Sequence, residues 1–487
     1  MRPHPAEALS SPTGLLHERR VARSIATARP GPPPRPGSVA DRLRARLDDL
    51  DPTWIGVAVF VAALVIYVAS NPARQNVYDH FVWQADAYLH GRFAITWPVV
   101  TDGFRNDYFQ DVYPLASAPG YALLPFPPLP AVLLTPFVAL GGLGTDAALL
   151  VACLGAVNVA LAWRLTSHVT SDRLAALVAT VFYGFGTVAW YAAMLGSTWF
   201  AAHVVASFFL FLAITLAVDG EDRERARAAV RRLPLDGRQF VAGLVFGVAA
   251  MARLTTILGV PFFVLVGSGG SVWRRGLSAA LGAAIPVVLL LAYNLASSGQ
   301  LFEPGYDYLY QTETVPIPAG LLAQVFPSLQ AIGYHPGIWN AEDLHYLPQN
   351  LLIMLAWLPT VQPQCGLEGL FSTTCALVRP DPLGTSLLLT SPAYLLAIPA
   401  LLAGWRDRLV IGATVAVALI AGADLIHFSQ GWVQFGYRFS NDLAPFALIL
   451  VTLGVARLGL RRAVVGLVAL SVLINAWGVF WGVALGW

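Results

Sequence analysis

Residues 53–70 read TWIGVAVFVAALVIYVAS, a run of apolar and small polar residues without a charged side chain. A helix that crosses a membrane needs about 20 mainly apolar residues, so this stretch predicts a membrane-spanning helix. The same criterion predicts spanning or partly spanning helices at residues 147–165, 174–191, 199–218, 239–252, 254–270, 277–296, 386–404, 409–427, 442–459 and 463–484. The chain is therefore expected to be an all-α polytopic membrane protein with about 11 transmembrane helices.

The composition supports the same class. The 487 residues are 56% hydrophobic and only 12% charged, whereas a soluble domain carries about 25% charged residues. The basic residues are all arginine, and the net charge of +2 says little about partners. No nucleic-acid partner is expected.

Residues 121–143 are apolar but contain five prolines. Prolines inside a helix remove backbone donors and clash with the preceding turn, so this segment is predicted to lie at the outer interface rather than to span. On that topology 24 of the 30 arginines fall on one side of the membrane. Because arginine concentrates in cytoplasmic segments, the N-terminus is expected in the cytoplasm and the C-terminus outside.

This topology divides the chain into four parts. Residues 1–51 are an Arg- and Pro-rich cytoplasmic tail that is expected to be disordered. Residues 52–296 are expected to form an N-terminal transmembrane module with a first outer loop, residues 71–146, that carries the candidate catalytic residues considered below. Residues 297–385 form an extracytoplasmic loop subdomain, and residues 386–487 the C-terminal transmembrane helices.

The second outer loop contains Cys365 and Cys375. If this loop faces an oxidising compartment, the two cysteines can form a disulfide; otherwise they are free thiols. Cys153 lies in an apolar run and is expected to be inert.

The first candidate for chemistry directly follows the first predicted span. Residues 76–93 read NVYDHFVWQADAYLHGRF and place Asp79, Trp83, Asp86 and His90 at helical spacing. Residues seven apart lie on nearly the same face of a helix, so an amphipathic helix in the outer interface is predicted. Its carboxylates either face water or, beside a membrane-embedded cavity, act as a general base.

Further candidates lie in the loops and at the ends of spans. Asp102 and Asp107, among aromatic residues, suit sugar hydroxyls but are also typical of a solvated loop. Arg253 lies within an apolar stretch and Arg438 at the start of a span, where either can bind a phosphate. The alternatives are that Arg253 pairs with an acid and that the Arg438 side chain extends to water.

The second outer loop also contains side chains that could form a metal site. The segment YHPGIWNAEDLHY contains four side chains that could bind a metal, namely His335, Glu342, Asp343 and His345. Two histidines and two acids in one loop are more often surface groups, so no metal is assigned.

Several of these segments carry a resemblance. The pattern Tyr78-Asp79-x5-Ala85-x3-Leu89-x-Gly91 resembles the first outer loop of GT-C glycosyltransferases, a superfamily that includes protein O-mannosyltransferases and the aminoarabinose transferase of lipid A. FPPLPAVLLTPFVALGG is similar to their Pro-rich segment, WYAAMLGSTWFAAHVVASFFLFLAI to their second outer loop and next helix, and GVAAMARLTTILGVPFF to their arginine-bearing hairpin. The resemblance covers most of residues 53–300. Looser matches are GYDYLY, which contains Tyr306, and GWVQFGYRFSNDLAPF, which contains Tyr437 and Arg438.

The resemblance implies an inverting transfer of a sugar from a polyprenyl-phosphate donor at the extracytoplasmic face of the plasma membrane. Asp79 matches the residue that deprotonates the acceptor hydroxyl, and the acceptor is a glycan, lipid or protein. His80 stands where many relatives have a second acid, so His80 or Asp86 is its expected partner. His203 stands where relatives have another acid, which weakens the case for a divalent cation.

The residues expected to bind substrate are Asp102, Asp107, His203, Arg253, Tyr306, Tyr437 and Arg438. No cofactor is assigned. Two other functions compete with the transferase: a transporter of polar solutes or lipid-linked sugars, and a non-catalytic membrane assembly protein.

Overall fold

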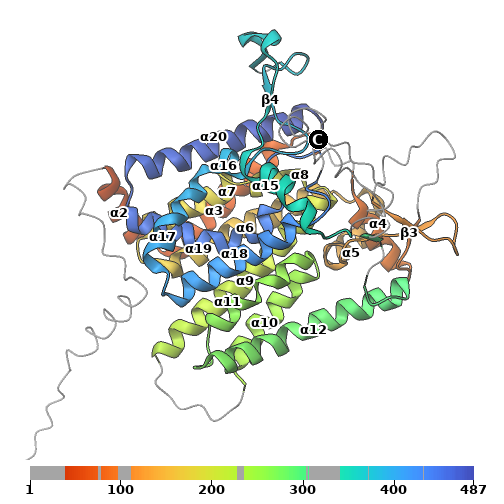
Figure 1. Cartoon of the computed structure of the whole chain (residues 1–487), viewed down its shortest axis with the longest axis horizontal. Coiled ribbons are helices and arrows are strands. Elements are labelled where there is room, and N and C mark those ends of the chain that lie inside the picture. The colour runs from red at the N-terminus through yellow and green to blue at the C-terminus, as the bar shows by residue number, and fades with distance from the viewer. Residues whose placement is uncertain are drawn as a thin grey trace, which may run out of the picture.

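A computed structural model describes the chain over residues 39–74, 78–96, 111–226, 235–302, 305–306, 340–370, 372–431 and 433–487. Within these ranges the protein is a bundle of helices with two small antiparallel sheets (Figure 1). Three of the predicted candidates, Asp102, Asp107 and His335, lie outside the described residues.

The bundle confirms the all-α polytopic class. Seven described helices are long and apolar enough to cross a membrane: α3 (Pro52–Ser70), α6 (Ala147–Val169), α9 (Thr198–Ala226), α12 (Val272–Ser298), α18 (Arg408–Leu425), α19 (Ser440–Leu458) and α20 (Arg462–Ala484). Helices α7 (Arg173–Phe185) and α8 (Ala189–Leu195) meet at a bend of 49° and make an eighth span if counted together.

The remaining predicted spans are shorter or broken. Residues 239–252 and 254–270 correspond to α10 (Gly237–Ala250), the 3₁₀ helix η3 (Leu254–Gly259) and α11 (Val260–Leu265), which form a hairpin turning at Arg253. Residues 386–404 break into α16 (Leu387–Thr390), η8 (Pro392–Ala397) and α17 (Ile398–Gly404), where two prolines interrupt the helix. The predicted number of 11 spans is therefore matched only in part.

The α10–α11 hairpin is closed by polar and close-packed contacts. The side-chain amide of Gln239 donates to the carbonyls of Phe263 at 2.6 Å and Val266 at 3.1 Å. Glycine lets α10 approach α12 closely, because a Cβ on Gly247 would lie 2.7 Å from the carbonyl oxygen of Ala283. Small residues at such crossings permit tight packing of membrane helices, and this packing holds the hairpin in place.

Residues 39–49 of the segment predicted to be disordered are helical, which corrects the prediction for that part of 1–51. Residues after the Pro-rich segment form helix α2 (Val39–Asp49). The Arg44 side chain pairs with Asp172 at 2.8 Å, and the guanidinium of Arg173 donates to the carbonyls of Leu47 and Leu50. These contacts stabilise a short amphipathic helix that would be marginal alone.

In the segment predicted to be the first outer loop, the described residues form helix α4 (His80–Leu89), a three-stranded sheet and helix α5 (Leu129–Gly141). The strands are β1 (Ile95–Thr96), β2 (Tyr113–Pro114) and β3 (Tyr121–Leu123), paired antiparallel in the order β1-β3-β2 with Ile95 opposite Ala122 and Tyr113 opposite Leu123. Residues 121–143 are thus a strand followed by a helix of 13 residues, about 20 Å long and shorter than the membrane core. The loop therefore contains a packed subdomain.

The segment predicted to be the second outer loop contains η5 (Leu344–Tyr346), α15 (Leu347–Ala356) and an arm. The arm includes β4 (Thr360–Val361), η6 (Pro363–Cys365), η7 (Leu367–Leu370) and β5 (Val378–Arg379). The arm projects from the bundle in Figure 1. A disulfide joins Cys365 to Cys375, and Cys153 is free and half-buried. The two cysteines of the loop are therefore a pair rather than free thiols.

The two ends of the bundle can be told apart by their ion pairs. At one, Arg164 pairs with Asp219 and Arg408 with Glu221; this end, which also carries α2, is called here the arginine-rich end. At the other, the loop end, Arg74 pairs with Asp146 beside α4 and α5. Figure 1 shows α2 and α4 at opposite ends of the molecule.

Candidate functional site

A buried ionic cluster lies at the loop end around Asp442, a residue that the sequence did not single out. Its Oδ1 lies 2.6 Å from Nδ1 of His203, and its Oδ2 accepts from Nε and Nη2 of Arg253 at 2.9 Å each. Thr255 Oγ1 also donates to Oδ2, at 3.1 Å. His203 and Asp442 are fully buried and the Arg253 side chain is 17% exposed. His203, Arg253, Thr255 and Asp442 are called here the Asp442 cluster.

Three elements bring the Asp442 cluster together. Asp442 lies in the first turn of α19, His203 in the second turn of α9, and Arg253 at the turn of the α10–α11 hairpin. The Arg253 amide donates to the carbonyl of Ala249, and Thr256 Oγ1 donates to the Arg253 carbonyl at 2.7 Å. The hairpin thus carries a charged side chain from the arginine-rich end into a buried site at the loop end.

A second carboxylate lies beside this cluster. Asp424, in the last turn of α18, is 2% exposed. Its strongest electrostatic neighbours are Asp442 and Arg253. Ionisable groups at such positions in membrane proteins are functional candidates by default, and this rule could have identified Asp424 within the apolar segment 409–427.

Arg438 lies in an aromatic cage next to the cluster. Its guanidinium carbon is 5.4 Å from the ring centre of Phe439, 5.8 Å from Phe200 and 6.0 Å from Trp199. The guanidinium of Arg253 lies 5.1 Å from the same Phe439 ring. Two cationic groups therefore share one aromatic ring, and such cation–π contacts stabilise a partly desolvated guanidinium.

The backbone around Arg438 is shaped to admit its side chain. Gly431 has φ +91°, and a Cβ at this position would lie 2.6 Å from the Arg438 guanidinium carbon. A side chain at position 431 would therefore clash with Arg438 and be strained in this conformation.

Asp79, predicted to lie on the helix, directly precedes α4, and its side chain makes no capping hydrogen bond to the helix. Its carboxylate is half-buried and accepts a hydrogen bond from the Trp83 side chain, and burial raises its pKa above the ordinary value for aspartate. A carboxylate with a raised pKa is a stronger base once it is ionised. This environment is compatible with the general-base role expected from the sequence.

His80 points into the protein. Its Nδ1 lies 2.9 Å from Thr198 Oγ1, and its ring lies near those of Tyr78 and Trp199. The side chain is fully buried. This position gives His80 a structural contact with the start of α9, and its predicted role as the partner of Asp79 stays a prediction.

Asp86 and His90 lie at the other end of α4. The carboxylate of Asp86 is 3.5 Å from Nδ1 of His90, whose side chain is 61% exposed. The hydroxyl groups of Tyr88 and Tyr293 are 3.0 Å apart, which ties α4 to α12. The predicted helix is present, but it is more buried than an interfacial helix, because six of its ten residues are covered by neighbouring elements.

Trp199 connects the start of α4 with the arginines. The centre of its ring lies 4.8 Å from that of Tyr78 and 5.8 Å from that of His80. The guanidinium carbon of Arg438 lies 6.0 Å from the centre of the same ring. Its indole nitrogen donates to Oδ2 of Asp111 at 2.6 Å. Trp199 begins the predicted span 199–218, within the stretch that resembles GT-C glycosyltransferases, and the sequence assigned it no role.

The two predicted tyrosines differ in environment. The Tyr306 ring lies 6.1 Å from His427 and 6.4 Å from Phe126, burial raises its pKa, and Arg253 and Arg438 are among its electrostatic neighbours. Tyr437 is fully buried against Phe439. Tyr306 therefore lies at the site, whereas Tyr437 packs beneath it.

The acids and histidine of the second loop, for which a metal site was considered but not assigned, form pairs where they are described. Asp343 lies 2.6 Å from His345, and Glu342 lies 3.2 Å from His427. Over the described residues, no group of three or more His, Cys, Asp or Glu side chains is close enough to hold a metal ion.

The chain was compared with models of protein families, with curated proteins and with solved structures, and none of the three comparisons gives a match.

Proposed function

We propose that the protein is a GT-C-type glycosyltransferase that transfers a sugar from a polyprenyl-phosphate donor to an acceptor hydroxyl, with inversion at the anomeric carbon. The observation that carries this proposal is the pair of guanidinium groups, Arg253 and Arg438, on the ring of Phe439 at one end of an apolar bundle. A lipid phosphate embedded in a leaflet is an anion that such a pair can bind.

Asp79 is the proposed general base. Its ionised carboxylate takes the proton of the acceptor hydroxyl, and the oxygen attacks the anomeric carbon. The bond from that carbon to the phosphate oxygen breaks, and polyprenyl phosphate leaves. The half-buried position of Asp79 beside Trp83 supports this role, since a carboxylate held away from bulk water is the more effective proton acceptor.

The arginines act on the leaving group. The donor phosphodiester carries one negative charge, and the departing phosphate gains negative charge as the bond to the sugar breaks. A guanidinium beside that oxygen therefore stabilises the transition state more than the ground state. Asp442 holds Arg253 in position through two hydrogen bonds to one oxygen.

The loop end is proposed to face the outside of the plasma membrane. The arginine-rich end would then be cytoplasmic, in line with the excess of arginine in cytoplasmic segments. A membrane-impermeant maleimide distinguishes the orientations in a Cys153→Ser background. His90→Cys should react in intact cells and Asp48→Cys only after lysis; the reverse pattern would invert the topology.

The function is tested with the purified full chain and a panel of polyprenyl-phosphate sugars. Release of polyprenyl phosphate with formation of a glycoside is expected for one of them. Asp79→Asn should reduce turnover about a hundred- to ten-thousandfold, the usual contribution of a positioned base, and Asp86→Asn should lose less. Full activity of folded Asp79→Asn would refute the assignment of the base.

The transporter alternative is supported by one feature of the fold. The α7–α8 bend and the α10–α11 hairpin are interruptions in the bundle, and transporters often bind substrates at broken helices. A transporter moves its substrate unchanged. Uptake of an intact lipid-linked sugar by vesicles containing the protein, without release of polyprenyl phosphate, would favour the transporter.

A further inference from the structure

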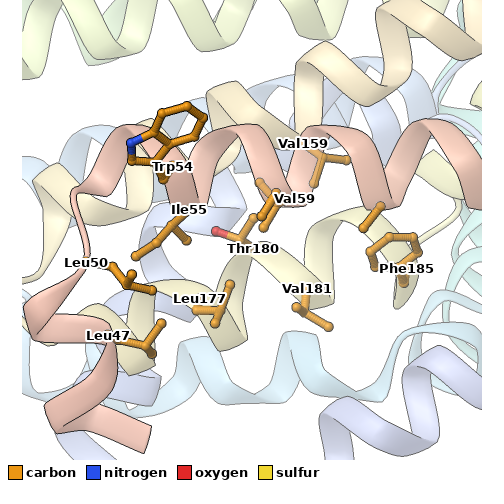
Figure 2. Close-up of a pocket in the computed structure, with 12 residues that line it drawn as sticks. Leu47, Leu50, Trp54, Ile55, Val59, Val159, Leu177, Thr180, Val181 and Phe185 are labelled. Carbon is orange, nitrogen blue, oxygen red and sulfur yellow. The ribbon is translucent and has the colours of Figure 1, made fainter.

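An apolar groove runs along the surface between α2, α3 and α7, away from the Asp442 cluster. Twelve residues line it: Leu47, Leu50, Trp54, Ile55, Ala58, Val59, Ala62, Val159, Leu177, Thr180, Val181 and Phe185. Figure 2 shows the side chains of α3 and α7 converging on this space, with Leu47 and Leu50 at one end and Phe185 at the other. The groove holds about 350 Å³.

Most of the groove offers a ligand no hydrogen-bonding group. Among the twelve lining residues, Thr180 contributes the one hydroxyl group. That hydroxyl donates to the carbonyl of Ala176 at 2.8 Å and lies 3.0 Å from Thr166 Oγ1. Since its hydrogen bonds are made within the protein, a polar ligand would be desolvated there without compensation, and a hydrocarbon would not.

The position of the groove identifies the source of that hydrocarbon. Its α3 wall is a helix long and apolar enough to cross a membrane, and Trp54 and Ala62 on it are eight residues apart, about 12 Å along the axis. At the α2 end the indole of Trp54 is 69% exposed and Arg42 and Arg46 are exposed. Tryptophan is enriched at the membrane–water interface, and arginine binds phosphate.

We infer that the groove binds one acyl chain of a membrane phospholipid, with the phosphate beside Arg42 and Arg46 of α2. This site is separate from the proposed donor site, because α2 and the Asp442 cluster lie at opposite ends of the bundle. The bound chain would fill the space under Leu47 and Leu50 and so help to hold α2 against α7. The inference stands whether or not the protein is a glycosyltransferase.

The amount of phospholipid that stays bound during purification tests for this site directly. The full chain is purified in detergent, and phospholipid per protein is counted by mass spectrometry. The parent is expected to retain phospholipid, whereas Ala58→Trp and Ala62→Trp, which fill the groove, should lose it. Val61→Trp is the matched control, because Val61 is 49% exposed on the same helix but does not line the groove; it should retain the lipid.

A second measurement uses the unmodified chain in vesicles of phosphatidylcholine and phosphatidylglycerol that carry a photoreactive acyl chain. After transfer to detergent and illumination, cross-links to Leu177 and Val181 should persist while those to Val61 disappear. Equal loss at both places would overturn the proposal. So would a parent that retains no phospholipid or a polyprenyl lipid instead, or groove variants that retain as much phospholipid as Val61→Trp.

Discussion

Helix α9 takes part in two ionic clusters of the same composition near its opposite ends. Near its start, His203 on α9 and Arg253 contact the two oxygens of Asp442 at 2.6 and 2.9 Å. Near its end, Asp219 of α9 is contacted by His168 and Arg164 at 3.0 and 3.2 Å. His203 and Asp442 of the first cluster are fully buried. In the second cluster Asp219 is 13% exposed, but its partners Arg164 and His168 are 58% and 37% exposed.

The difference in burial separates two uses of the same chemistry. Ion pairs with exposed partners are screened by water and contribute about 0–1 kcal/mol to stability. The Asp219 cluster is therefore expected to have little effect on the free energy of unfolding. Buried ions cost several kcal/mol each to desolvate and persist where the surrounding structure holds them. The Asp442 cluster therefore bears a larger desolvation cost than the Asp219 cluster, and buried ionisable groups that carry such a cost are candidates for functional sites.

The largest expected effect is on the buried cluster. Asp442→Asn keeps the shape of the side chain but removes the charge that compensates Arg253, so the free energy of unfolding should fall by about 3 to 5 kcal/mol. Thermal unfolding of the full chain in detergent measures this loss. A change below about 1 kcal/mol would show that the Asp442 cluster behaves like the exposed one.

Next come the arginines that the proposed function uses. Arg253→Lys and Arg438→Lys keep the positive charge but lose the planar group that bonds phosphate and stacks on Phe439. Loss of one or more charge-assisted hydrogen bonds, about 1.5 to 3 kcal/mol, corresponds to roughly a ten- to a hundredfold lower turnover.

Arg164→Lys at the arginine-rich end is the control and should turn over at the parent rate. Parent activity in both Arg253→Lys and Arg438→Lys, with the fold intact, would leave these arginines as structural charges.

The pH profile gives a smaller and more specific effect. A general base must be ionised, so activity is present above the pKa of Asp79 and is lost as pH falls through it. Burial raises this pKa, so the acid limb of kcat/KM should lie above the value of about 3.9 for an ordinary aspartate. Asp86→Asn should keep the limb. Persistence of the same limb in the residual activity of Asp79→Asn would assign it to another group.

The sequence predicted the parts of this comparison that follow from local pattern. Apolar length predicted the spans, and Arg253 became a candidate because charge is costly within an apolar segment. His203 became a candidate only through the resemblance to GT-C glycosyltransferases. The sequence also predicted helix α4 from the spacing of Asp79 and Asp86, and the resemblance implied a hairpin that carries Arg253. These features depend on neighbours within one or two turns of the chain.

The partners could not be predicted in this way. Asp442 is 189 residues from Arg253 and 239 from His203, and no periodicity relates residues on separate helices. Pro392 and Pro399 are a local signal for the breaks within residues 386–404, but the prediction of a span there followed apolar length alone. Helix α2 was missed because its stability comes from Asp172 and Arg173, which lie on α7.

The smallest effect is expected at Asp219, and it is the stricter test of the comparison. Asp219→Asn should lower the free energy of unfolding by no more than about 1 kcal/mol at low salt, since exposed pairs contribute little. Raising the ionic strength to 1 M shortens the Debye length to about 3 Å and should abolish even this difference. The loss in Asp442→Asn should survive the same salt, because ions do not penetrate the packed interior. If the two variants respond equally to salt, burial does not distinguish the clusters, and the buried charges at the loop end give no reason to place the function there.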